Sequence, residues 1–459
     1  MKRFLKLNFK VIFSLFVVLT LTLPIFSADS DTGLDFKIPE VEYSKYELDN
    51  GMEIYVIEDH DVPLVKFSVW YRVGSIDETK GITGISHMLE HSMFLGTETL
   101  KKDQVHKLVK QVGGISNAGT FYDFTMYYEE LPSAKLELAV AIEADRMRNL
   151  EFSKEAFQNE TDVVRQERRR RIENNFFQSA LEKVQAKAFK DSGLHHQIIG
   201  WGKDIENYTK KDLLNYYREY YAPNNAVAIV AGDVDPDNVH KLVKKYFGDY
   251  KREKITRREQ KELKQKEERF IKIEKVTKLP VIAMMYKVPR GNHKDFPAIS
   301  ALMDILINNP NSRVKKELKR NKRLIMQAGG FPLGLRIPGF SLVYAIPMSE
   351  KNMDKVKKGI DKEIDKIIKN GVSDKELKRV KKSTMKQMVF MQKDKTNFTR
   401  TIAGNVVRFN NPELYKRNLK IIKNLTSKDI QRVAKKYFSD NNRTVGYVVP
   451  KKNNKKNNK

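Results

Sequence analysis

Apolar and polar residues follow two different periods along this chain. Residues 52–57 and 64–71 are short apolar runs joined by an Asp-His-Asp turn, which predicts two neighbouring strands. Residues 85–94 and 102–112 place apolar residues every three or four positions, the spacing of helices. Gly113 and Gly114 follow the second of these segments and end it.

Further along, Ser153 is the predicted N-cap of a long helix that continues toward Phe189. Residues 226–231 are again an apolar run and predict a buried strand. Because strands and helices mix without strict βαβ repeats, the chain is expected to have an α+β fold. Each layer would be a mostly antiparallel sheet with helices packed on one face.

The pattern also repeats. Three segments recur 217 residues later: 62–64 at 279–281, 209–213 at 426–430, and 220–225 at 437–442. A constant offset predicts a duplicated domain of about that length. The expected divisions are a signal peptide (1–28), a first α+β domain (29–250), a charged linker (251–268), a second α+β domain (269–450) and a disordered Lys/Asn tail (451–459).

The amino-terminal residues are typical of an export signal. Residues 1–10 carry four basic residues and no acid, an apolar run of 16 residues follows, and Ser27-Ala28 offers a cleavage site. The alternative is a retained anchor, although the run is shorter than the ~20 residues that span a bilayer comfortably. We therefore expect a periplasmic or secreted protein, with membrane association as a further option.

Composition narrows the choice of chemistry. The chain has no cysteine, which excludes disulfides and thiolate metal sites. Its formal net charge is +28, yet no basic motif interleaved with aromatic residues is present, so nucleic acid is not an expected partner. The tail 451–459 could instead give weak contact with an anionic membrane surface.

The strongest chemical signal is the segment His87-Met88-Leu89-Glu90-His91. Residues four apart lie on one helical face, so both imidazoles can reach one metal ion with Glu90 beside them. The order H-x-x-E-H is that of inverted zinc peptidases. A zinc site of this kind needs a third protein ligand. Glu160 and Glu167 are both candidates, since they are two helical turns apart, and spacing alone does not choose between them.

With these motifs the chain resembles the pitrilysin/insulysin family of zinc peptidases, which includes the mitochondrial processing peptidase. The similarity continues through residues 113–120, 123–127, 199–201, 221–225 and 232–233. The resemblance implies that His87, His91 and Glu167 bind one Zn²⁺ per chain. It also implies that Glu90 is the general base and that Glu160 supports the ligands.

The resemblance implies a substrate site as well. The family's edge strand receives a peptide as an added strand, and Asn117 and Ala118 stand at the matching positions. Arg336 and Tyr344 are the candidates in the second half for binding the substrate carbonyl. No metal site is expected there, because His87, Glu90 and His91 fall on aspartate, isoleucine and asparagine at the 217-residue offset.

The sequence thus predicts an exported zinc metalloendopeptidase that hydrolyses unfolded peptides. Each chain would be half of a clamshell, and two chains would enclose a chamber as a homodimer or as a heterodimer with a related subunit. The alternative is a non-catalytic chamber or scaffold subunit of such a complex.

Overall fold

The computed structural model describes residues 40–258, 264–393 and 395–451. The predicted signal peptide and all but the first residue of the predicted tail lie outside these ranges. Within them, no helix is both long and apolar enough to cross a membrane.

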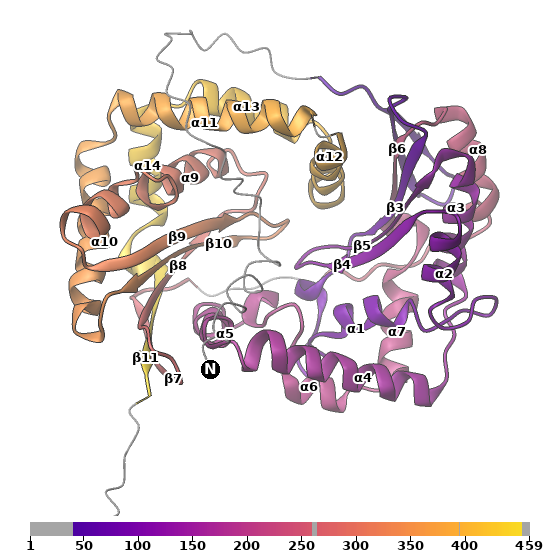
Figure 1. The fold of residues 1–459 in the computed structure, drawn as a ribbon, viewed down its shortest axis with the longest axis horizontal. Helices are drawn as coiled ribbons and strands as arrows, with labels where there is room; N and C mark the ends of the chain where they lie inside the picture. The colour runs from indigo at the N-terminus through magenta and orange to yellow at the C-terminus, as the bar shows by residue number, and fades with distance from the viewer. Residues whose placement is uncertain (1–39, 259–263, 394, 452–459) are drawn as a thin grey trace, which may run out of the picture. The chain divides into compact units, whose positions relative to one another are not determined.

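The first sheet has six strands (Figure 1). Their spatial order is β1 (Ser44–Glu47), β2 (Glu53–Glu58), β6 (Ala226–Gly232), β3 (Leu64–Tyr71), β5 (Thr125–Pro132) and β4 (Ile115–Thr120). Only the β2–β6 pair is parallel. β4 is an edge strand and pairs with β5 alone.

The second sheet repeats this topology. Its order is β7 (Arg269–Lys275), β11 (Arg443–Pro450), β8 (Val281–Val288), β10 (Gly339–Pro347) and β9 (Ile325–Leu333). Again one pair, β7–β11, is parallel and the others are antiparallel. Apart from β1, the strands correspond one to one, so the predicted α+β fold of two duplicated halves is confirmed.

The helices follow the same duplication. Those of the first half are α1 (Ile85–Ser92), α2 (Gln104–Gln111), α3 (Leu136–Arg148), α4 (Lys154–Arg168), α5 (Phe176–Ala188), α6 (Gly202–Asn207), α7 (Lys210–Tyr220) and α8 (Pro236–Phe247). Those of the second half are α9 (Phe296–Met303), α10 (Met353–Asn370), α11 (Asp374–Lys393), α12 (Lys395–Phe409), α13 (Leu414–Lys423) and α14 (Ser427–Tyr437). The repeated Thr-x-x-Asp motif forms a capping box at the start of both α7 and α14.

Alternate residues of β3 face two different helical layers. Val65, Phe67 and Val69 join the core that contains α3, as the strand's period of two requires. The intervening Ser68 and Trp70 face α12, a helix from the second half, across a small cavity.

The second sheet is covered in the same reciprocal way. Met284 and Tyr286 of β8 pack into the core with α9 and α10. Ala283 and Met285 lie in a separate core with α5, a helix from the first half. The segment 217 residues after α5 falls largely within α12. The two halves have therefore exchanged equivalent helices.

The long helix predicted from Ser153 is interrupted. It forms as α4 with the Ser153 hydroxyl as N-cap, then continues into a π turn at Arg169–Glu173. A new helix, α5, starts after Asn175, whose side chain accepts bonds from two backbone amides. This second N-cap redirects the chain, so that α4 carries the acidic site residues while α5 packs against the second sheet.

Candidate metal centre

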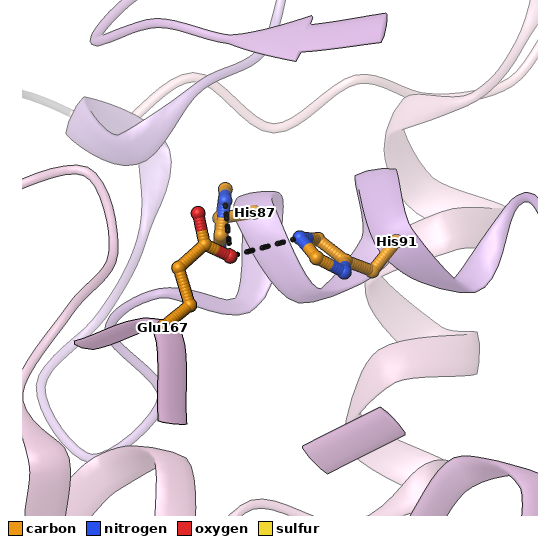
Figure 2. A group of neighbouring side chains, drawn as sticks. All are labelled: His87, His91 and Glu167. Carbon is orange, nitrogen blue, oxygen red and sulfur yellow. Dashed lines mark ion pairs between the residues drawn. The ribbon is translucent and has the colours of Figure 1, made fainter. Parts of the chain in front are cut away.

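The site is built on α1 and on the end of α4. His87 and His91 lie one turn apart on α1, and Glu167 approaches them from α4 (Figure 2). The three side chains offer ligand atoms that all lie within 4.8 Å of one another. Oε2 of Glu167 is 3.3 Å from Nε2 of His91 and 3.9 Å from Nε2 of His87. The resemblance chose Glu167 over Glu160 as the third ligand. In the structure Glu167 lies in the group of ligand atoms and Glu160 does not, and the ligand role of Glu167 stays a prediction.

The start of α1 is fixed by two contacts. Glu78 accepts hydrogen bonds from the amides of Gly84 and Ser86, at 2.6 and 2.9 Å, so it caps the helix that carries both histidines. Gly200, with φ of +76°, packs against the backbone at Thr83 so closely that a Cβ would lie 2.2 Å from the Thr83 carbonyl oxygen. The Ile-Gly-Trp motif at 199–201 thus acts by close backbone approach.

Glu160 supports His91 and does not join the ligand group. Its Oε1 lies 2.9 Å from Nδ1 of His91. A carboxylate at Nδ1 fixes the imidazole tautomer in which Nε2, once it releases its proton, offers its lone pair to a metal ion. Burial alone would lower the pKa of His91, but hydrogen bonding to Glu160 and Glu167 outweighs it and raises that pKa to about 9.

The other two side chains are held in their metal-binding charge states. Burial, with the positive charge of His91, lowers the pKa of His87 to about 3, so His87 is neutral. Burial opposes ionisation of Glu167, yet the His91 hydrogen bond and the charges of its basic neighbours lower its pKa to about 2. A neutral imidazole and a carboxylate are the forms that bind divalent cations.

The donor set fits zinc. Two imidazoles and one carboxylate form a known catalytic zinc set, with bonds of about 2.0–2.2 Å that place ligand atoms of a tetrahedron roughly 3.4 Å apart. The observed separations of 3.3 and 3.9 Å are close to that value. Nδ1 of His87, the ring nitrogen that does not face Glu167, is buried without a hydrogen-bond partner among the described residues.

Glu90 lies beside this group. Its carboxylate accepts a hydrogen bond of 2.6 Å from the Thr120 hydroxyl, at the end of edge strand β4. Burial raises the pKa of Glu90 above its ordinary value, against the effect of that hydrogen bond. A carboxylate with a raised pKa is suited to accept and return a proton near neutral pH.

The predicted substrate residues are dispersed. Asn117 and Ala118 lie on β4, the free edge of the first sheet, where the Asn117 side chain accepts a bond from the Ala118 amide. Tyr344 on β10 contacts Phe177 of α5, with ring centroids 5.6 Å apart. The guanidinium of Arg336 pairs with both oxygens of Asp77. The structure therefore places the first pair near α1 but does not bring Arg336 or Tyr344 into the group of ligand atoms.

Three residues at the site were not predicted from the sequence: Glu78, Thr120 and Arg171. Thr120 lies inside a motif that carried the family resemblance, but the motif does not show which way its hydroxyl points. Arg171 is the last of four consecutive arginines, 168–171, and the sequence does not single it out from the other three. In the structure its Nη1 lies 2.5 Å from Oε1 of Glu167.

Two histidines one helical turn apart, with a carboxylate as the third member of the group of ligand atoms and a glutamate between them, are the arrangement typical of a metallopeptidase centre. Two family models match the chain: Insulinase (Peptidase family M16) over residues 54–201, and Peptidase M16 inactive domain over residues 207–384. The zinc protease PqqE of Helicobacter pylori is 31% identical over 410 residues, which are 88% of this chain and 92% of that protein. The chain belongs to peptidase family M16.

Solved structures agree with this assignment. The crystal structure of a protease from Helicobacter pylori has a TM-score of 0.85 and 30% identity, covering 90% of this chain and all of that one. The periplasmic protease PqqL from Escherichia coli shares the fold, with a TM-score of 0.73 and 20% identity, and the match covers 90% of this chain and 48% of that chain. This chain therefore corresponds to about half of that longer protein.

Proposed function

We propose that this protein is an exported, zinc-dependent endopeptidase that hydrolyses unfolded peptides. The observation that supports this most strongly is the convergence of three ligand atoms from His87, His91 and Glu167 within 4.8 Å. The intact glutamate between the histidines adds the group that the reaction needs.

The residues would divide the chemistry as follows. His87, His91 and Glu167 would hold zinc, which when bound activates water and polarises the scissile carbonyl. Glu90 would accept the proton of the attacking water and return it to the leaving amide nitrogen. The Thr120 hydroxyl would keep that carboxylate in place, and Glu160 would hold His91 in the binding tautomer.

Edge strand β4 would position the substrate. An extended peptide added to this edge would bond to the main chain near Asn117 and Ala118, a mode that tolerates many sequences. The strand ends at Thr120, which contacts Glu90, so a peptide in this register would run toward the general base. Arg336 and Tyr344 remain the predicted carbonyl-binding residues, but Arg336 would have to leave Asp77 to serve a peptide.

We further propose that two chains, identical or related, pair around the substrate. The match to only 48% of the longer periplasmic protease supports this, because that chain has room for a second unit of the same size. The amino-terminal pattern of basic and apolar residues supports export to a periplasm or beyond the cell.

A second property is supported by the distribution of charge: contact with an anionic membrane surface. Residues 40–250 contain 27 Lys and Arg against 35 Asp and Glu, whereas residues 251–450 contain 49 against 20. A bias toward lysine throughout the whole chain would raise the lysine content of both segments. Such a bias therefore does not explain why only residues 251–450 have an excess of basic residues. On α11 four exposed lysines, Lys375, Lys378, Lys382 and Lys386, recur at helical spacing on one face.

The test of the enzyme proposal compares wild type with Glu90→Gln on a mixed library of unfolded peptides, with and without a zinc chelator. General bases contribute on the order of 10²–10⁴-fold, so the variant should lose about that much activity while retaining its zinc. Mass spectrometry of internal cleavage products would establish endopeptidase action. Glu98→Gln, the same change at an exposed position, is the control.

Two outcomes would contradict the proposal. Equal cleavage by wild type and Glu90→Gln would show that the hydrolysis does not come from this site. Zinc bound by a wild-type protein that cleaves nothing in the library, alone or with a related subunit, would favour the alternative of a non-catalytic chamber subunit.

A further inference from the structure

The two oxygens of the Glu167 carboxylate have different partners. Oε2 is directed to the two imidazoles, at 3.3 Å from His91 and 3.9 Å from His87. Oε1 is paired with Nη1 of Arg171 at 2.5 Å. The carboxylate is thus divided between the ligand group on one side and a guanidinium on the other.

Arg171 is distinct within the run of four arginines to which it belongs. Arg168 is buried and forms a two-pronged ion pair with Glu182, at 2.9 and 3.0 Å. Arg169 and Arg170 are exposed. Only Arg171, one turn beyond Glu167 and within the π turn, contacts a residue of the ligand group.

We propose that Arg171 is a positioning residue that makes Glu167 a one-oxygen ligand. With Oε1 held by the guanidinium, only Oε2 can face the metal ion, and the second oxygen cannot take up the position that water needs. Catalytic zinc sites require such an open position. This inference rests on the proposed zinc site and adds to it the group that sets the geometry of the acidic ligand.

Two effects of Arg171 oppose each other, and their sizes decide the prediction. A positive charge near a divalent cation disfavours binding, but 40% of the Arg171 side chain is exposed, so solvent and salt screen that repulsion. Fixing the orientation of a ligand by a second residue is commonly worth 10–100-fold in metal affinity. Orientation should therefore dominate, and removal of the side chain should weaken zinc binding.

The experiment measures zinc affinity by competition with a chromophoric chelator. Arg171→Met should weaken affinity about 10–100-fold. Arg171→Gln keeps an amide donor for Oε1 and should lose less. Arg170→Met removes the neighbouring exposed arginine and should leave affinity unchanged. Thermal unfolding of the metal-free proteins checks that every variant is folded.

A second readout follows the geometry itself. With Co²⁺ in place of zinc, the visible absorption of the ion weakens as its coordination number rises. Arg171→Met should show weaker absorption per bound ion than wild type, because Glu167 becomes free to bind through both oxygens. A merely structural role of Arg171 would not change this spectrum.

The possible failures are distinguishable. If wild type binds one zinc and Arg171→Met binds it as tightly, or more tightly, with an unchanged Co²⁺ spectrum, the role assigned to Arg171 is wrong while the enzyme proposal stands. If wild type binds no zinc, or Glu167→Gln binds it as well as wild type, the proposed zinc site itself is wrong.

Discussion

The two halves share one topology but differ at the positions that matter for chemistry. His91 of the first half corresponds to Asn308, whose side chain accepts a hydrogen bond from Gly330 of β9. Glu90 corresponds to Ile307, which is fully buried. Where the first half directs polar groups toward a shared point, the second half uses the same positions to hold its own edge strand and core.

The halves also differ in charge, by about 37 elementary charges between segments of similar length, from −8 over residues 40–250 to +29 over residues 251–450. The fold is compatible with both compositions because the added lysines lie largely on exposed helical faces. The two halves have therefore kept one fold while their site residues and their surface charge have diverged. The predictions below test each of these separations, beginning with the largest effect.

The contrast in metal chemistry predicts one zinc per chain. His91→Ala should reduce bound zinc from one ion to none, because two remaining ligands hold zinc only weakly. Asn308→Ala, the same change at the equivalent position of the second half, should leave one ion bound. Metal analysis of dialysed protein measures both. Zinc retained by His91→Ala, or two ions in the wild type, would remove the proposed difference between the halves.

The contrast in charge predicts binding to vesicles of phosphatidylcholine with phosphatidylglycerol, falling steeply as salt rises. Changing Lys375, Lys378, Lys382 and Lys386 to Gln should weaken binding on the order of 10–100-fold. This is less than the loss expected if each lysine contributed its full value of about 1 kcal/mol to the binding free energy. The matched control changes Lys101, Lys102, Lys107 and Lys110, four exposed lysines of the first half, and alters net charge equally. Equal effects would mean that net charge alone matters.

Because α5 packs against the second sheet, we expect substitutions in α5 and in β11 to affect each other's cost in stability. A Cβ at Gly446 would lie 2.2 Å from Cγ2 of Val184, so Gly446→Ala should destabilise the protein by about 1–3 kcal/mol. Val184→Ala removes that methyl group and should recover part of the loss in the double variant. The equivalent residue of the first sheet is Ile229, which already carries a large side chain facing α12. Urea unfolding measures these changes in the free energy of unfolding. If the changes of the two single variants simply add up in the double variant, the contact between Gly446 and Val184 is contradicted.

An ion pair specific to the second half predicts a small effect that depends on pH. Arg313 donates to both oxygens of Glu376, at 2.7 and 2.8 Å. At the 217-residue offset the equivalent residues of the first half are Gly96 and Asn159, which cannot form an ion pair. Burial would raise the pKa of Glu376, but the Arg313 hydrogen bonds outweigh it and lower that pKa to about 2.

Because the folded-state pKa is lowered, the pair stabilises the protein above the ordinary carboxyl pKa of about 4.3 and loses this effect as pH falls toward 2. Glu376→Gln should cost about 1 kcal/mol at pH 7, a figure reduced for solvent screening. Its unfolding midpoint should approach that of the wild type between pH 5 and pH 3. A gap independent of pH would mean that the charge of Glu376 contributes little.

Much of the fold could be predicted because its signals are local or repeated. The strands at 64–71, the capping boxes of α7 and α14 and the constant offset are all visible in the sequence. The exchange of α5 and α12 could not be predicted, because helical periodicity shows that a face is buried but not which sheet buries it. The interruption before α5 was missed because Asn175 lies within an otherwise helical pattern.

The site was predictable to a similar extent. The spacing of His87 and His91 alone indicates a shared ligand face, whereas the choice of Glu167 over Glu160 needed the family resemblance. Glu160 is expected from the resemblance to support the ligands, and in the structure its Oε1 lies 2.9 Å from Nδ1 of His91. The roles of Thr120 and Arg171 depend on side-chain direction across separate elements, which no spacing in the sequence encodes.

The reciprocal placement of α5 and α12 has a consequence for proteolysis. A nick in the segment 251–268 would separate the halves covalently, but each fragment would still carry a helix seated on the other fragment's sheet. The two fragments of the cut protein should therefore elute together in size-exclusion chromatography and separate only in denaturant. An interlocked pair of this kind tolerates a broken connection in a way that two independently folded modules would not.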